Sequence, residues 1–114
     1  TIDHSLVEEF VLQGVITREE ARVHPQRNII TRAVGVHPAV YADIFERKWS
    51  AGDLLLLSSD GLHGPLSDEE IARELSLDRP LEETCAALVK AALAQGGTDN
   101  ITVVLVRCEE EDVL

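Results

Sequence analysis

The sequence predicts an α+β fold in which helices lie on one side of a mixed β-sheet. Two segments with helical periodicity open the chain, and two more follow its middle. Two strongly apolar runs, at residues 54–58 and 101–108, have the composition of buried strands. The predicted order along the chain is α-α-β-β-β-α-α-β, and its 114 residues suit one domain.

Two helices are predicted in the N-terminal part of the chain. Residues 4–13 carry apolar side chains at helical spacing, and Gly14 follows as a C-cap. Residues 17–20, Thr-Arg-Glu-Glu, have the pattern of a capping box, in which the Thr hydroxyl and the second Glu satisfy backbone N–H groups reciprocally. This pattern predicts a second helix that continues to about Val23 and ends before Pro25.

The middle of the chain favours β-structure. Residues 28–35 predict a short strand followed by a turn, and residues 39–49 are rich in β-branched and aromatic side chains. Residues 50–53, Ser-Ala-Gly-Asp, predict a turn that leads into the apolar strand 54–58. We therefore expect three strands before the third helix.

The C-terminal part returns to helix and then to strand. Residues 67–70, Ser-Asp-Glu-Glu, form a second capping box that opens a helix to about Leu75. Pro80 begins a longer helix that ends at Gly96-Gly97. We expect that helix to bury one apolar face made of Leu81, Cys85, Leu88, Ala92 and Leu93.

The charge of the chain limits its partners. It has 21 Asp and Glu against 10 Lys and Arg, a formal net charge of −11, and residues 109–114 form an acidic tail. Nucleic acids and anionic membranes bind through Lys and Arg, so we expect neither as a partner. The longest apolar run is also far shorter than the roughly 20 residues of a membrane helix.

Two cysteines, Cys85 and Cys108, have no Cys or His at zinc-ligand spacing. They fit a reducing compartment, where thiols stay free, so we expect a cytoplasmic protein. Both thiols are expected to pack as small apolar side chains.

Two aspartates stand where apolar strands end or begin. Asp60 directly follows the run Leu-Leu-Leu-Leu-Ser-Ser, and Asp99 precedes the strand at 101–108. If these strands are antiparallel neighbours, both carboxylates lie at the same end of the sheet. Carboxylates held close together repel each other unless a cation or proton joins them, and Mg²⁺ or Mn²⁺ suits oxygen ligands. The alternative is that both residues are ordinary turn formers.

Residues 52–71, GDLLLLSSDGLHGPLSDEEI, and residues 96–106, GGTDNITVVLV, resemble two signature stretches of the metal-dependent protein phosphatases of the protein phosphatase 2C type. Residues 3–35 resemble the bacterial branch of that family, and the three stretches occur in the family's order. The resemblance covers residues 1–107 and identifies the chain as the C-terminal half of a catalytic domain.

The resemblance implies part of an α-β-β-α sandwich, in which two antiparallel sheets are flanked by helices. It implies hydrolysis of phosphoserine and phosphothreonine on other proteins by a water activated at a binuclear Mn²⁺ or Mg²⁺ centre. By position, Asp60 and Asp99 are metal ligands, Asn100 fixes the turn, and Gly61 leaves room beside the metals. Residues of about 14–50 correspond to a flap-like region. No catalytic side chain other than the two ligands is assigned.

The family's other metal ligands and its phosphate-binding Arg have no counterpart in these 114 residues, which contain no methionine and begin at Thr1. We therefore expect a piece of a longer protein that is inactive alone. Its expected partners are phosphorylated proteins, the missing N-terminal half, or a second copy of the chain. The alternative is a non-catalytic, phosphatase-like module that binds proteins through its acidic surface.

Overall fold

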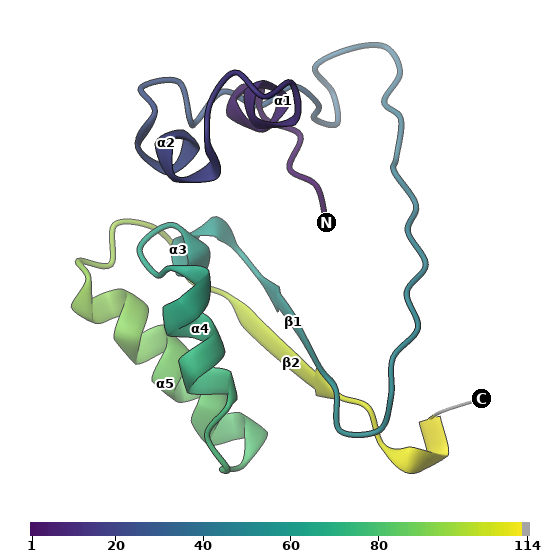
Figure 1. The fold of residues 1–114 in the computed structure, drawn as a ribbon, viewed down its shortest axis with the longest axis vertical. Helices are drawn as coiled ribbons and strands as arrows, with labels where there is room; N and C mark the ends of the chain where they lie inside the picture. The colour runs from purple at the N-terminus through teal and green to yellow at the C-terminus, as the bar shows by residue number, and fades with distance from the viewer. Residues whose placement is uncertain (113–114) are drawn as a thin grey trace. The chain divides into compact units, whose positions relative to one another are not determined.

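The computed structural model describes residues 1–112, so the last two residues of the acidic tail 109–114 lie outside the described part. The chain divides into two compact units, one of residues Thr1–Arg47 and one that begins at Lys48 (Figure 1). Each unit is described by itself.

The first unit begins with the two predicted helices. Helix α1 spans Leu6–Leu12, and the hydroxyl of its N-cap Ser5 accepts the N–H of Glu8 at 3.2 Å. Helix α2 spans Arg18–Val23, and the Thr17 hydroxyl accepts the N–H of Glu20 at 3.1 Å. Both helix predictions are confirmed, because each start is fixed by a capping side chain only three residues away.

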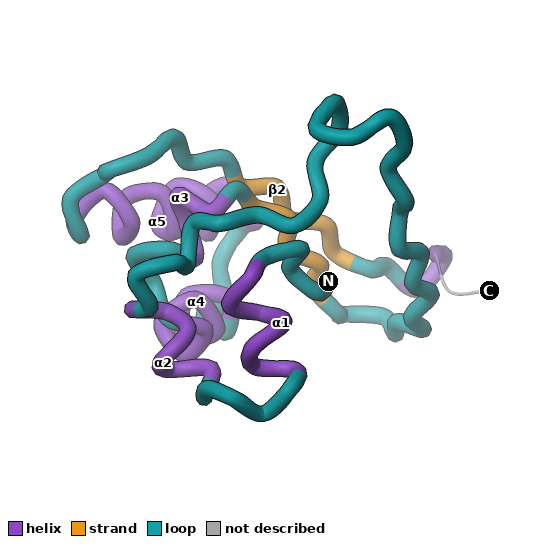
Figure 2. Tube along the Cα trace, turned by 90° about the horizontal axis from the view of Figure 1, so that it is seen from above, coloured by secondary structure: helices purple, strands orange, loops and turns teal. Residues whose placement is uncertain are grey.

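The strands predicted at 28–35 and 39–49 are wrong. Ile30 forms only an isolated antiparallel bridge with Ser5. The Thr31 N–H donates to the His4 carbonyl at 2.8 Å, and the Leu6 N–H donates to the Ile29 carbonyl at 3.0 Å. Residues 39–49, all of which the structure describes, form loop (Figure 2). β-Branched residues favour a strand only where a neighbouring strand pairs with them, and no such neighbour is present within residues 1–47.

The second unit contains a two-stranded sheet. Strand β1, Leu54–Ser58, pairs antiparallel with β2, Val103–Arg107, in a register that joins Leu54 to Arg107 and Ser58 to Val103. Both strand predictions are confirmed. The mixed sheet predicted from the element order is wrong, since among the described residues the two strands form one antiparallel pair.

Three helices accompany this sheet: α3 at Asp60–His63, α4 at Asp68–Leu75 and α5 at Leu81–Ala94. The predicted capping box of α4 is complete, with Ser67 and Glu70 satisfying each other's backbone N–H groups. A short 3₁₀ helix, η1, follows β2 at Glu110–Asp112. The helices and the sheet enclose one buried apolar cluster, formed by Leu62, Leu66, Ile71, Leu88 and Ala92.

The buried face of α5 differs from the prediction. Thr84, Leu88 and Ala92 are buried, whereas Leu93 is 56% exposed. Residues spaced by four lie on one helical stripe, and Leu93 follows Ala92 by about 100° around the helix. Leu93 therefore turns away from the cluster to which Leu88 belongs.

The two faces of the sheet have different surroundings. On the inner face, Leu56 and Val103 pack against the buried cluster. The side chains on the opposite face of the sheet are 38–51% exposed. We call this face the outer face; its residues are Leu55, Leu57, Val104 and Val106. The register pairs Leu55 with Val106 and Leu57 with Val104, so these four side chains form one continuous apolar patch. Within residues 1–112, no helix combines the length and apolarity needed to cross a membrane.

Candidate metal centre

Asp60 and Asp99 lie at the same end of the β1–β2 pair. The last register pair at that end joins Ser58 to Val103, and Asp60 follows Ser58 closely while Asp99 precedes Val103. Asp60 is the first residue of α3, and Asp99 lies in the turn before β2. Both residues are exposed. The two strands are therefore antiparallel neighbours, which is the condition under which the sequence predicts both carboxylates at the same end of the sheet.

Ser59 fastens the two turns to each other. Its hydroxyl donates to the Asn100 carbonyl at 3.1 Å and accepts the Thr102 N–H at 3.0 Å. Its backbone N–H donates to the Thr102 carbonyl at 3.0 Å. Ser59 occupies the N-cap position of α3, yet its side chain bonds across to the other turn rather than capping its own helix. The sequence shows a Ser before Asp-Gly, but it does not show that Asn100 and Thr102 are the hydrogen-bond partners of that Ser.

Gly61 allows the same two turns to approach closely. A Cβ at this position would stand 2.0 Å from the Asn100 carbonyl oxygen and 2.8 Å from its carbon. Contacts this short are impossible without a backbone shift, so only glycine fits. The family resemblance predicts that Gly61 leaves room beside metals; in the structure, the backbone of Asn100 occupies the space next to Gly61.

The Asp99-Asn100 turn is held by its own side chain. The Asn100 N–H donates to Oδ1 of Asp99 at 2.7 Å, while the Asn100 carbonyl accepts the Ser59 hydroxyl. One Asp99 carboxylate oxygen thus fixes the turn that carries it.

The carboxylates of Asp60 and Asp99 are of the type that binds a hard divalent ion, but they are too few to hold one by themselves. Carboxylate oxygens are the ligands that Mg²⁺ and Mn²⁺ prefer. Within residues 1–112, however, no group of three or more His, Cys, Asp or Glu side chains is placed to hold a metal ion. Asp60 and Asp99 could therefore contribute to such a site without completing it.

The first unit holds a polar cluster that the sequence did not reveal. Nε2 of His4 lies 2.7 Å from Oδ2 of Asp43, and Nη1 of Arg32 donates to Oδ1 of Asp43 at 2.9 Å and to the Tyr41 carbonyl at 3.1 Å. The hydrogen bond from His4 and then that from Arg32 lower the pKa of the Asp43 carboxyl below its ordinary value. We call His4, Arg32 and Asp43 the clasp.

The cysteines behave as the sequence predicted. Both are free, and Cys108 is fully buried while Cys85 is partly buried. Burial, and then the neighbouring carboxylates, raise the pKa of the Cys108 thiol, which keeps it in its protonated, unreactive form.

Comparison with known proteins agrees with this arrangement. A family model described as Stage II sporulation protein E (SpoIIE) matches residues 12–109. Protein phosphatase PhpP of Streptococcus pneumoniae serotype 2 is 46% identical over 112 residues, which are 98% of this chain and 46% of PhpP. The crystal structure of serine/threonine phosphatase Stp1 from Staphylococcus aureus has a TM-score of 0.91 at 43% identity, over 96% of this chain and 43% of Stp1.

The chain belongs to the protein phosphatase 2C-type family. The likeness to Stp1 also confirms the predicted fold, part of a sandwich of antiparallel sheets flanked by helices. The chain spans less than half the length of the curated relatives it matches. The crystal structure of the catalytic domain of serine threonine protein phosphatase PstP in complex with 2 manganese ions has a TM-score of 0.78 at 39% identity, over 92% of this chain and 42% of that chain.

Proposed function

We propose that the protein to which this chain belongs is a metal-dependent protein serine/threonine phosphatase acting on phosphoproteins in the cytoplasm. One observation carries the proposal: the turn at Asp60 and the turn at Asp99 are locked together at one end of the sheet by Ser59 and Gly61. The family membership and the manganese ions bound by PstP support the same function.

In this proposal Asp60 and Asp99 hold Mn²⁺ or Mg²⁺. A divalent ion held there would lower the pKa of its bound water and so supply a nucleophile for hydrolysis. The role of this chain is to fix two of the carboxylates. Hydrogen bonds from Ser59 and the close approach at Gly61 prevent the turns from separating. Such support matters, because loss of groups that orient metal ligands costs about 10–100-fold in affinity or activity.

The test uses the full-length protein and the variants Asp60→Asn and Asp99→Asn. Asparagine keeps the shape of each side chain and, at residue 99, the acceptor for the Asn100 N–H. We expect Mn²⁺ affinity, measured by calorimetry, and hydrolysis of p-nitrophenyl phosphate and a phosphoserine peptide to fall by more than the loss of about 10–100-fold that removal of a ligand-orienting group causes.

The matched control is Asp68→Asn, which removes an exposed carboxylate from the first turn of α4 and belongs to neither of the two turns. It should retain both properties. Unchanged Mn²⁺ affinity in Asp60→Asn and Asp99→Asn would refute the assignment of the metal ligands. The 114-residue chain alone should bind Mn²⁺ weakly and hydrolyse neither substrate, since it offers only two of the carboxylates; turnover by the chain alone would show that its own residues suffice.

We also propose that the outer face of the sheet packs against a second sheet of the same catalytic domain. The four exposed side chains form a continuous apolar patch with no cover among residues 48–112. Burying apolar area contributes about 25 cal/mol per Å², which favours association. Sedimentation of the 114-residue chain, with and without the rest of the domain, checks this. A monomer that does not bind the rest of the domain would contradict it, and self-association would show that a second copy covers the face instead.

A further inference from the structure

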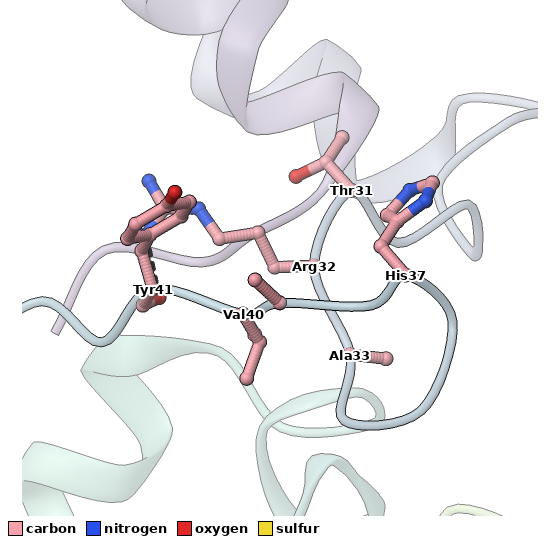
Figure 3. Close-up of a pocket in the computed structure, with 7 residues that line it drawn as sticks. Thr31, Arg32, Ala33, His37, Val40 and Tyr41 are labelled. Atoms are coloured by element: carbon pink, nitrogen blue, oxygen red, sulfur yellow. Dashed lines mark hydrogen bonds between the residues drawn. The ribbon is translucent and has the colours of Figure 1, made fainter.

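Two side chains show two different ways of joining separate segments of this chain. In the first unit, Arg32 lines a pocket and reaches toward Tyr41, whose carbonyl accepts its hydrogen bond at 3.1 Å (Figure 3). Its other partner, Asp43, forms an exposed ion pair with it, and such pairs contribute little to stability. In the second unit, the Ser59 hydroxyl binds two backbone groups, which lie 41 and 43 positions along the chain. Ser59 thus uses both its donor and its acceptor to fix main chain to main chain.

The Ser59 hydroxyl takes the place of the Ser59 carbonyl in the ladder of the sheet. The β1–β2 register ends with Ser58 opposite Val103, so the next residues along are Ser59 and Thr102. The Ser59 N–H donates to the Thr102 carbonyl at 3.0 Å, as in an antiparallel ladder. The return bond, from the Thr102 N–H, goes to Oγ of Ser59 at 3.0 Å. The pair is therefore closed, but one of its two bonds ends on a side chain.

This exchange leaves the Ser59 carbonyl available to begin a helix. It accepts the Leu62 N–H at 3.2 Å, in the first turn of α3, which starts at Asp60. A carbonyl in a ladder points across the sheet, whereas a carbonyl at a helix start points along the helix. Because the hydroxyl supplies the ladder bond, the carbonyl can take the helical direction. The chain therefore passes from strand to helix directly before Asp60 without opening the sheet at Thr102.

The same hydroxyl reaches the turn that carries Asp99. It donates to the Asn100 carbonyl at 3.1 Å, and the Asn100 N–H donates to Oδ1 of Asp99 at 2.7 Å. A continuous series of hydrogen bonds thus runs from the Asp99 carboxylate through Asn100 to Ser59, and from the Ser59 carbonyl to Leu62 in the helix that begins at Asp60. A movement of either aspartate turn would strain this series.

We propose that Ser59 is a positioning residue that couples Asp60 to Asp99, so that its hydroxyl controls the affinity of the two carboxylates for a divalent ion. This inference rests on the proposed metal-dependent function and adds an energetic link between the two ligands. Loss of a group that orients metal ligands costs about 10–100-fold in affinity. Linkage also requires the reverse effect: an ion that binds better when the Ser59 bonds are formed must favour those bonds by the same factor.

The first test measures Mg²⁺ binding by calorimetry in the full-length protein, with the ion alone as the probe. In Ser59→Ala the affinity should fall by about 10–100-fold. Ser59→Thr keeps a hydroxyl at the same position and should restore the affinity. The matched control is Ser58→Ala, one residue earlier on β1, because the described hydrogen bonds between the two turns do not involve the Ser58 hydroxyl. Its affinity should equal that of the unmodified protein.

The second test measures the reverse effect by amide hydrogen exchange, followed by NMR. Mg²⁺ is used because Mn²⁺ is paramagnetic and would broaden the signals. In the unmodified protein, saturation with Mg²⁺ should slow exchange of the Thr102 N–H, which donates to Ser59, by a factor similar to the affinity lost in Ser59→Ala. In Ser59→Ala this N–H has lost its acceptor, so it should exchange rapidly with and without Mg²⁺.

Unchanged Mg²⁺ affinity in Ser59→Ala would overturn the proposal, as would a loss of the same size in Ser59→Thr or Ser58→Ala. Exchange of the Thr102 N–H that does not respond to Mg²⁺ in the unmodified protein would overturn it too. That measurement needs no substitution, so it remains decisive if Ser59→Ala fails to fold. If Asp60→Asn and Asp99→Asn lose affinity while Ser59→Ala keeps it, the coupling alone is wrong; if both aspartate variants keep it, the assignment of the ligands is wrong.

Discussion

In the second unit a cluster of apolar side chains, among them Leu62 and Leu88, is fully buried, whereas within residues 1–47 the buried apolar side chains are Val7 and Ala21. The first unit depends instead on polar contacts: the clasp, an isolated bridge between Ser5 and Ile30, and an ion pair from Arg18 to Glu8 at 3.1 Å.

This difference predicts that the candidate metal centre and the clasp respond differently to pH and salt. Apolar packing is insensitive to moderate changes of pH and salt, whereas exposed ion pairs are weakened by both. The carboxylates of the candidate metal centre stand on the apolar unit and should keep their positions. The clasp belongs to the first unit and should respond to pH and salt. The predictions below test this contrast, from the largest expected effect to the smallest.

The largest effect is expected for Leu88→Ala. Leu88 is fully buried in the cluster, and replacing such a leucine by alanine costs about 2–5 kcal/mol in free energy of unfolding. Chemical denaturation combined with hydrogen exchange should show the loss in β1, β2 and α5. The control is Leu93→Ala on the same helix, 56% exposed, which should change stability by less than about 0.5 kcal/mol. Similar losses for both variants would mean that the burial pattern of α5 is wrong.

A smaller effect is expected for Gly61→Ala. The added Cβ would stand 2.0 Å from the Asn100 carbonyl oxygen, and insertion of a methyl group into a packed site costs about 1–3 kcal/mol. Hydrogen exchange should show faster exchange of the Ser59 and Thr102 N–H groups, whose bonds join the two turns. The amides of residues 1–47 should be unaffected. Unchanged exchange at Thr102 would contradict the close approach of the turns.

The smallest effect concerns the clasp and its dependence on pH. Because His4 and Arg32 lower the pKa of Asp43 in the folded chain, its carboxylate stabilises the clasp above the ordinary pKa of about 3.9. That contribution is lost as the pH falls through the lowered pKa. Amide chemical shifts of residues 41–44, followed by NMR below about pH 4, should therefore show a transition.

Asp43→Asn should remove this transition, and Glu46→Gln, which changes an exposed carboxyl on the same loop, should preserve it. The transition should leave the amides of β1 and β2 unchanged, because their unit is held by apolar packing. A transition of equal size in Asp43→Asn would show that another group controls the loop.

The sequence by itself determined the features that depend on neighbouring residues. The starts of α1, α2 and α4 follow from Ser5, Thr17 and Ser67, each of which bonds a backbone N–H three residues later. Continuous apolar runs at 54–58 and 101–108 predict the two strands, of which the structure forms Leu54–Ser58 and Val103–Arg107, and the residues around Asp60 and Asp99 indicate the family. Local contacts of this kind can be derived from spacing alone.

Tertiary structure decided the features that depend on residues far apart in the chain. Residues 39–49 have the composition of a strand, but within residues 1–47 no neighbouring strand pairs with them. Leu93 is apolar, like the buried residues of α5, but it lies on the exposed side of that helix. The bonds from Ser59 to Asn100 and from His4 to Asp43 join residues 41 and 39 positions apart. The chemical type of a side chain determines which hydrogen bonds and contacts it can make. Its actual partner is determined only when the chain has folded, because strand pairing and burial depend on the neighbouring residues as much as on the residue itself.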